Sequence, residues 1–285
     1  EVWLITAGGV TFAAFPLMYA VMFSSLYSAL MLVLFALIFR AVSLEFRNQK
    51  EGPRWRAAWD LGTVLGSLLP ALLLGVAFGN IFQGIPIDGE GVYHGTLLTL
   101  LNPYGLLTGV VFVMLFLVHG AIWQAIKAEG DLHQRSLSAA KKLWPVLLVI
   151  AVVFLGATKF ATGLWNNYLE TPLLLVIPLV AVAGLLLTRL FLAQASCWKA
   201  WFASCITIVG CTLFGVIGLY PTMLPSSLNA DYSLTAFNSA STPLTLKIML
   251  VVALIFVPIV IGYQTWVFVL FKDKVTKEDL AHEAY

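Results

Sequence analysis

The sequence predicts an all-α polytopic membrane protein with about eight transmembrane helices. Of its 285 residues, 60% are hydrophobic and only 11% are charged, whereas a soluble domain is about 25% charged and about 45–50% apolar. The apolar residues gather in continuous runs, and a helix needs about 20 of them to cross a bilayer. A transmembrane β-barrel would alternate polar and apolar residues instead. We therefore expect residues 1–285 to form a single transmembrane domain in a lipid bilayer.

Eight apolar runs mark the expected spans. The first two are separated only by a Ser-Ser-Leu-Tyr segment, which predicts a tight hairpin or a bend within the membrane. Pro16, Pro70, Pro178 and Pro258 lie inside runs and predict kinks rather than breaks, because neighbouring helices can satisfy the carbonyl groups that proline leaves unpaired. In chain order the runs are Val2–Phe23, Leu26–Phe39, Leu61–Phe82, Leu106–Ile126, Val146–Ala161, Leu173–Phe191, Trp201–Leu219 and Met249–Phe271.

Positive charge is distributed unevenly between the two sides of these runs. Of the 16 Lys and Arg residues, 14 lie at alternate connections or in the segment 272–285. The opposite connections, 83–102, 165–172 and 220–245, contain none. Because Lys and Arg are retained on the cytoplasmic side, we expect the basic end and the C-terminal tail, 272–285, to be cytoplasmic.

The first run begins almost at the first residue. With this orientation it must travel outwards from the cytoplasmic side, yet it follows Glu1 without an initiator Met or a signal peptide. We therefore expect the chain to be a fragment that lacks its N-terminus, including at least one further helix.

The residue inventory excludes several classes of function. A net charge of +2 leaves no basic surface suited to nucleic acid, and the sequence has no phosphate-binding loop and no HExxH motif. Cys197, Cys205 and Cys211 lack CxxC spacing, so we interpret them as small apolar residues rather than metal ligands or disulfides. Two glycine-rich strings, Ala7-Gly8-Gly9 and Gly75–Gly79, predict close helix contacts.

The four histidines are poorly placed to bind haem. Only His119 lies within an apolar run, whereas His94, His133 and His282 lie in connections or the tail. A bis-histidine site needs two ligands at matched depth, so we do not expect this chain to build a haem site from its histidines alone. We interpret His119 as a buried, hydrogen-bonded histidine rather than a ligand or proton carrier.

Charged residues at the edges of the runs are a second kind of candidate, because a charge at mid-bilayer costs about 2.5–3.5 kcal/mol. Lys159 and Arg189 can extend to the membrane faces. Arg40 ends the second run and Asp60 begins the third, where the helix dipole favours a cation and an anion respectively. Two interpretations stay open for Arg40 and Asp60: a paired cap on a helical hairpin, or a site of proton uptake.

Several strings resemble subunit II of the cytochrome bd-type quinol oxidases. They occur in order along nearly the whole chain, although the likeness over residues 130–215 is mainly one of hydropathy. The strings are Glu1–Gly9, Phe12–Pro16 with Tyr19, Phe39-Arg40, Arg54-Trp55-Arg56, Trp59-Asp60, Gly75–Asn80, Gln83-Gly84 with Pro86, Leu101–Leu107, Pro225-Ser226-Ser227 and Thr276–Asp279.

The resemblance implies a haem-free subunit of a respiratory complex in a bacterial or archaeal-type inner (plasma) membrane. In this family subunit I holds two b-type haems and haem d, oxidises quinol and reduces oxygen to water, and subunit II is its haem-free companion. A bound quinone and a small third subunit stay open. The family subunit has nine helices, so eight runs are consistent with the loss of the first.

The resemblance also implies roles for three residues. Carboxylates of the family's first helix and of the stretch before Glu1 belong to a proposed proton path, whose remainder would begin around Arg40 and Asp60. The tryptophan that matches Trp3 lies near a hydrophobic route by which oxygen reaches haem d. Packing of Trp3 against the partner explains its presence equally well.

A secondary transporter is the alternative from another functional class. Transporter sites lie at mid-membrane in broken helices, and the runs that contain proline are compatible with this. The lack of a polar or charged cluster at mid-depth argues against it.

Overall fold

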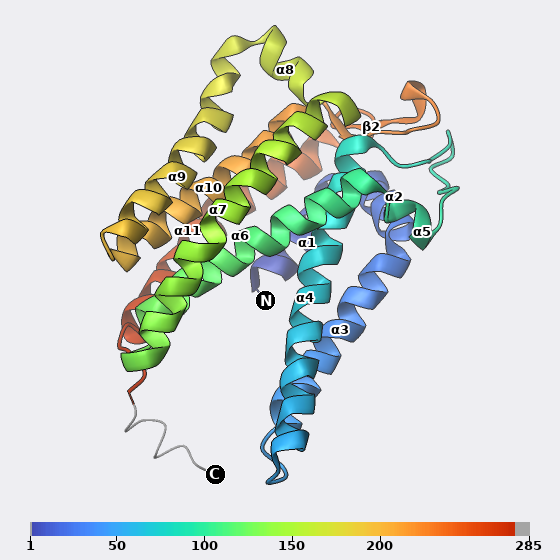
Figure 1. Cartoon of the computed structure of the whole chain (residues 1–285). Coiled ribbons are helices and arrows are strands. Elements are labelled where there is room, and N and C mark those ends of the chain that lie inside the picture. Colours follow the sequence, from blue (N-terminus) through green and yellow to red (C-terminus); the bar gives the residue numbers. More distant parts are fainter. Residues whose placement is uncertain (1, 277–285) are drawn as a thin grey trace.

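The computed structural model describes residues 2–276, which form long helices and one small two-stranded sheet (Figure 1). α5, α8 and the strands lie at one end, and the connections α3–α4 and α6–α7 lie at the other. This is the all-α polytopic architecture that the sequence predicts. The elements are α1 Val2–Ala14, α2 Pro16–Ser25, α3 Tyr27–Phe46, α4 Pro53–Gln83, α5 Leu97–Leu100, α6 Pro103–Lys127, α7 Gly130–Ala161, α8 Trp165–Glu170, η1 Pro172–Leu175, α9 Val176–Ala193, α10 Cys197–Leu219, β1 Thr222–Leu224, η2 Ala230–Tyr232, β2 Leu234–Thr235 and α11 Pro243–Leu270.

Within the described residues, 7 helices are long and apolar enough to cross a membrane: α3, α4, α6, α7, η1 with α9, α10 and α11. The first predicted run is divided into α1, of 13 residues, and α2, of 10. Because a single span needs about 20 residues, an eighth span requires α1 and α2 to cross together.

Pro16 causes the division between α1 and α2. Proline has no N–H to donate and disfavours helical backbone in the residue before it, and Phe15 accordingly has φ −136° and ψ 64°. The kink predicted at Pro16 is therefore wrong, because the helix breaks there. Pro70 and Pro258, in contrast, lie inside the continuous helices α4 and α11. Only Leu26 separates α2 from α3, as the predicted tight connection requires.

A line of small residues brings α4 and α6 close together. A Cβ atom added to Gly75 would lie 2.7 Å from the Cα of Gly109, and one added to Gly79 would lie 2.9 Å from the Cα of Gly105. We call this contact, with Thr108 at its centre, the α4–α6 seam. It confirms the close contact predicted at Gly75–Gly79.

The same prediction for the first glycine-rich string is wrong within this chain. A Cβ atom on Gly8 or Gly9 of α1 would have no neighbour within 4 Å. These glycines therefore make no close contact with another described helix.

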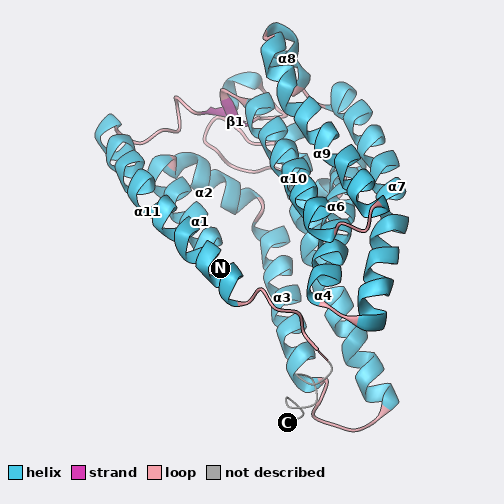
Figure 2. Cartoon of the chain, turned by 90° about the vertical axis from the view of Figure 1, so that its left-hand side faces the viewer, coloured by secondary structure: helices cyan, strands magenta, loops and turns pink. Residues whose placement is uncertain are grey.

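α11 lies against α1 and stands apart from the other long helices (Figure 2). None of its residues is buried. Near its C-terminal end, the ring of Phe268 packs against those of Trp123 and Trp201, with centroids 5.6 and 6.3 Å apart. α11 is therefore held by α1 and near its C-terminal end, and most of its apolar surface is exposed.

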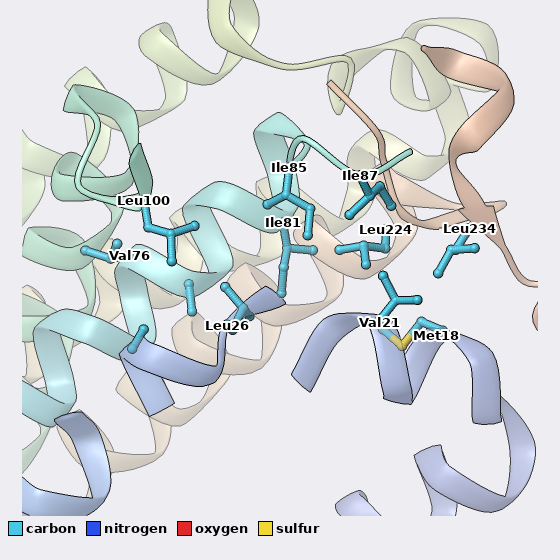
Figure 3. Close-up of a cluster of buried hydrophobic side chains, with 12 residues drawn as sticks. Met18, Val21, Leu26, Val76, Ile81, Ile85, Ile87, Leu100, Leu224 and Leu234 are labelled. Carbon is cyan, nitrogen blue, oxygen red and sulfur yellow. The ribbon is translucent and has the colours of Figure 1, made fainter. Parts of the chain in front are cut away.

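A buried hydrophobic cluster ties α2 to the end of α4 (Figure 3). Val21 of α2 and Ile81 of α4 pack with Ile85, Ile87 and Leu224 from the connections that follow α4 and α10. Backbone hydrogen bonds fix these connections, because Ile85 N–H donates to the Pro225 carbonyl at 3.0 Å. The end of the molecule whose connections contain no Lys or Arg is thus a packed cap.

Candidate functional site

Asp60 lies on α4 and forms an ion pair with Arg47, the residue that follows α3. Nε of Arg47 donates to Oδ1 at 2.5 Å, and a terminal guanidinium nitrogen donates to Oδ2 at 3.4 Å. The Asp60 side chain is 53% exposed and that of Arg47 is 40% exposed. The carboxylate is therefore held in place by Arg47 and exposed on the surface of the chain.

The interpretation of Arg40 and Asp60 as paired helix caps is wrong. Both helices extend beyond the apolar runs, since α3 continues to Phe46 and α4 begins at Pro53. Asp60 thus lies about two turns inside α4, whereas the helix dipole acts within the first or last turn. The error arose because polar side chains end an apolar run without ending the backbone hydrogen bonds of a helix.

The structure does not bring Arg40 and Asp60 together. Arg40 lies inside α3, about two turns before its C-terminal end. Its backbone packs against α4 there, because a Cβ atom added to Gly66 would lie 2.9 Å from the Arg40 Cα. Arg47 takes its place as the partner of Asp60. Sequence reasoning missed Arg47, although the basic residues around the α3–α4 connection indicated that a partner was near.

Trp3 lies in α1, which packs against α11. Its side chain lies outside the described part of the structure. The role in oxygen access that the resemblance implies therefore stays a prediction.

The tail predicted over 272–285 begins close to the α6–α7 connection. The Val275 N–H donates to the Lys127 carbonyl at 2.9 Å, and the Lys127 ammonium donates to the Phe271 carbonyl at the end of α11. Residues 277–285 lie outside the described residues. The first part of the tail is thus fixed at the basic end of the helices.

The three described histidines lie in separate places. His94 Nε2 is 2.7 Å from Oδ2 of Asp88, His119 Nδ1 is 2.8 Å from the Ser204 hydroxyl, and His133 Nδ1 is 2.6 Å from the carbonyl oxygen of Ala125. His119 is half-buried and hydrogen-bonded, as our interpretation of that residue expects, and the prediction that it is neither a ligand nor a proton carrier stays a prediction. His282 lies outside the described residues. As placed, the described histidines do not offer a pair of haem ligands.

Other metal-ligating side chains are also dispersed. In the part of the chain that the structure describes, no group of three or more His, Cys, Asp and Glu residues could hold a metal ion. Cys197, Cys205 and Cys211 are free thiols on α10, consistent with our interpretation of them. That this chain ligates no haem stays a prediction.

Asp88 and His94 form an acid–base pair that sequence reasoning missed. Oδ1 of Asp88 accepts hydrogen bonds from the Glu90 and Val92 N–H groups at 3.0 and 2.9 Å. The hydrogen bond from His94 and those from the backbone hold the pKa of Asp88 below its usual value. The signal in the sequence was an Asp-Gly-Glu-Gly turn with a histidine shortly after it. This pair holds the connection that leaves α4.

Buried Asn80 and half-buried Asn102 were also missed as a unit. The Asn80 amide donates to the Leu100 and Val76 carbonyls at 2.7 and 2.8 Å, and its oxygen accepts from Asn102 at 2.8 Å. The Asn102 oxygen in turn caps α6 by accepting from the Gly105 N–H at 2.7 Å. We call this set the Asn80–Asn102 network, and it lies at the end of the α4–α6 seam.

Comparisons with known proteins identify the family. The family model described as cytochrome bd terminal oxidase subunit II matches residues 1–271. The chain is 35% identical to a probable cytochrome oxidase subunit 2 of Haemophilus influenzae, over 93% of this chain and 78% of that protein. It is also 35% identical to the cytochrome bd-I ubiquinol oxidase subunit 2 of Escherichia coli, over 100% and 83%.

A cytochrome bd ubiquinol oxidase subunit 2 of Bacillus subtilis is 33% identical, over 98% of this chain and 82% of that protein. These matches confirm the resemblance seen in the sequence and favour a quinol oxidase subunit over a secondary transporter. Together with the apolar helices they indicate a multi-pass protein of the inner membrane. The chain belongs to the cytochrome bd terminal oxidase subunit II family.

Proposed function

We propose that this chain is the haem-free, non-catalytic subunit of a quinol:oxygen oxidoreductase, and that it supports a haem-bearing subunit I. Haem b and haem d, bound in that partner, would supply the electron transfer from quinol to oxygen. The observation that carries the proposal is the separation of His94, His119 and His133, each of which is hydrogen-bonded on a different element.

The haem content of the purified complex tests this proposal. Replacing His94, His119 or His133 by Gln, one at a time, should leave the optical spectrum and the haem content per complex unchanged. Loss of one haem from any of these variants would overturn the proposal. A stoichiometric low-spin haem spectrum from this chain purified alone and loaded with haem would overturn it as well.

We further propose that Asp60 takes part in proton uptake, with Arg40 on the same helical hairpin. The exposed carboxylate can exchange protons with water, and Arg47 fixes its position. Asp60→Asn should lower turnover at saturating quinol and oxygen, on the order of 10²-fold if the carboxylate transfers protons.

Arg47→Gln is the matched control for Asp60→Asn, because it breaks the same ion pair and leaves the carboxylate in place. It should retain most of the turnover. If the two variants lose turnover equally, the ion pair matters for structure and the proton role of Asp60 is wrong.

We also propose that Trp3 shapes an apolar route for oxygen. An indole can line such a route without bonding to a nonpolar gas. Trp3→Ala should therefore change the KM for oxygen at constant haem content and constant quinol KM. An unchanged oxygen KM would leave packing as the role of Trp3.

The orientation of the chain is part of the proposal. The connections α3–α4 and α6–α7, both rich in Lys and Arg, lie at the same end as the last described residues of the chain (Figure 1). The positive-inside rule then supports a cytoplasmic C-terminus. A reporter fused to the C-terminus should be active only if it works in the cytoplasm.

A further inference from the structure

The contact between α7 and α9 at the basic end holds an arginine in a defined position. The Trp144 indole N–H donates to the Leu185 carbonyl at 2.9 Å and joins the two helices. The guanidinium carbon of Arg189 lies 5.7 Å from the centre of the Trp144 ring, and one guanidinium nitrogen donates to the Lys141 carbonyl at 3.2 Å. Arg189 therefore spans the contact and keeps its other N–H groups for a further partner.

Further cations lie on α7 and at the start of α10, at the same end of these helices as Arg189. Lys141 and Lys142 are adjacent on α7, and the Lys199 ammonium lies 6.0 Å from the centre of the ring of Phe191, two residues after Arg189. We call the set Lys141, Lys142, Arg189 and Lys199 the basic seam. The ion pairs found among the described residues lie elsewhere: Arg47–Asp60, His94–Asp88 and Arg135–Asp131. The basic seam is thus a local excess of positive charge.

Exposed aliphatic side chains continue from the basic seam towards the middle of the helices. Val146 and Val149, on the turns of α7 after Trp144, are 47% and 63% exposed. Leu186 and Leu190, next to Arg189 on α9, are 52% and 49% exposed. A ligand that binds both the basic seam and these aliphatic side chains carries an anionic group at one end and hydrocarbon at the other.

We propose that the basic seam binds the phosphate headgroup of an anionic phospholipid, whose acyl chains lie along the exposed aliphatic residues of α7 and α9. A guanidinium presents paired N–H groups that match two phosphate oxygens. Lys142 and Lys199 add positive charge at the same end of these helices, as in basic sites between transmembrane helices that select acidic lipids. The site is independent of the role proposed for Asp60, which lies on the α3–α4 hairpin.

Lipid retention by the purified complex tests the site. The complex is stripped of lipid in detergent, titrated with phosphatidylglycerol or phosphatidylcholine, and examined by native mass spectrometry. The wild type should retain phosphatidylglycerol in preference to phosphatidylcholine. Lys142→Gln/Arg189→Gln should weaken phosphatidylglycerol binding by about 30-fold, since each cation near an anionic membrane surface contributes about fivefold.

Lys50→Gln/Arg54→Gln is the matched control, because it removes the same charge from the α3–α4 connection, which lies apart from α7 and α9 (Figure 1). It should stay within about twofold of the wild type, since surface charges separated by more than a Debye length are largely screened. Haem content and elution volume show that both variants are folded.

Three outcomes would overturn the proposal. The first is equal loss of phosphatidylglycerol in the two double variants, which would indicate only the general field of the basic end. The second is equal retention of phosphatidylcholine and phosphatidylglycerol by the wild type. The third is displacement of the lipid by millimolar inorganic phosphate, which would indicate a site for a free ion.

Discussion

The α4–α6 seam and α11 are equally suited to a membrane, but they pack in opposite ways. The most apolar stretches of α4, α6 and α11 have mean hydropathies of 2.1, 2.3 and 2.8, yet 39%, 39% and 0% of these stretches are buried. Lipid tails are as apolar as Leu, so apolarity drives insertion and does not hold one helix against another. Small residues and buried hydrogen bonds hold helices together, and the α4–α6 seam has both.

The contrast also shows which part of the chain leaves apolar surface uncovered. α11 presents apolar side chains on most of its surface, and α1 covers only one side of it (Figure 2). Bilayer lipid or a partner subunit must cover the rest, because water cannot. The α4–α6 seam, in contrast, is covered by side chains of the chain itself.

The largest expected effect is that of adding volume to the α4–α6 seam. Gly75→Val should lower the free energy of unfolding by about 3 kcal/mol, the upper end of the range for overpacking, because the new Cβ would meet the Gly109 backbone at 2.7 Å. Unfolding of the complex in detergent, followed by circular dichroism, measures this change. Gly262→Val on α11 is the control, since a Cβ there has no neighbour within 4 Å; equal losses would refute the contrast.

Removing the Asn80–Asn102 network should have the next largest effect. Asn80→Leu leaves the Leu100 carbonyl without its partner and the Asn102 amide with only the Thr99 carbonyl at 3.3 Å. An unsatisfied buried polar group costs about 1–3 kcal/mol. The same unfolding experiment applies. The control is Thr265→Val on α11, where the hydroxyl bonds only within its own helix, to Ile261 at 2.8 Å, so a change under about 0.5 kcal/mol is expected.

The attachment of α11 near its C-terminal end should be weaker. Phe268→Ala removes the ring contacts with Trp123 and Trp201, and aromatic pairs contribute about 0.5–1.5 kcal/mol each beyond burial. We expect a loss of about 1 kcal/mol and faster hydrogen exchange of the Val275 amide, which bonds to Lys127. Unchanged exchange at Val275 would show that the tail is held independently of α11.

The smallest effect should be an acid-dependent loosening of the cap near the α4–α6 seam. A carboxyl group whose pKa is lowered on folding, such as Asp88, stabilises the folded state above the ordinary aspartate pKa of about 3.9, and this stabilisation is lost as the pH falls through the folded value. Hydrogen exchange of residues 85–93, corrected for its intrinsic pH dependence, should therefore rise below about pH 4. In Asp88→Asn the exchange should already be raised at neutral pH, and a wild-type response above pH 5 would contradict this account.

Some positions could be predicted from the sequence and others could not. Gly75–Gly79 was predicted correctly because small residues in a long apolar helix favour close contact, whereas the same logic was wrong for Gly8 and Gly9. Asp60 was located at the basic end, but its partner proved to be Arg47. Which basic residue pairs with Asp60 depends on where the two helices end and on how each is rotated about its own axis. Hydropathy gives neither of these.

The sequence by itself determined the class, the approximate positions of the spans and the side on which positive charge gathers. These follow from the cost of placing polar groups and charges in hydrocarbon, which acts on each segment separately. The break at Phe15 follows locally from Pro16, although hydropathy does not show it. Only the tertiary structure decided how α3 and α4 pair beyond the apolar runs, and the isolation of α11. It also decided the meeting of Trp144, Lys141 and Arg189 at the basic seam. Such contacts depend on which faces of the helices meet, and this is fixed by packing between segments far apart in the chain.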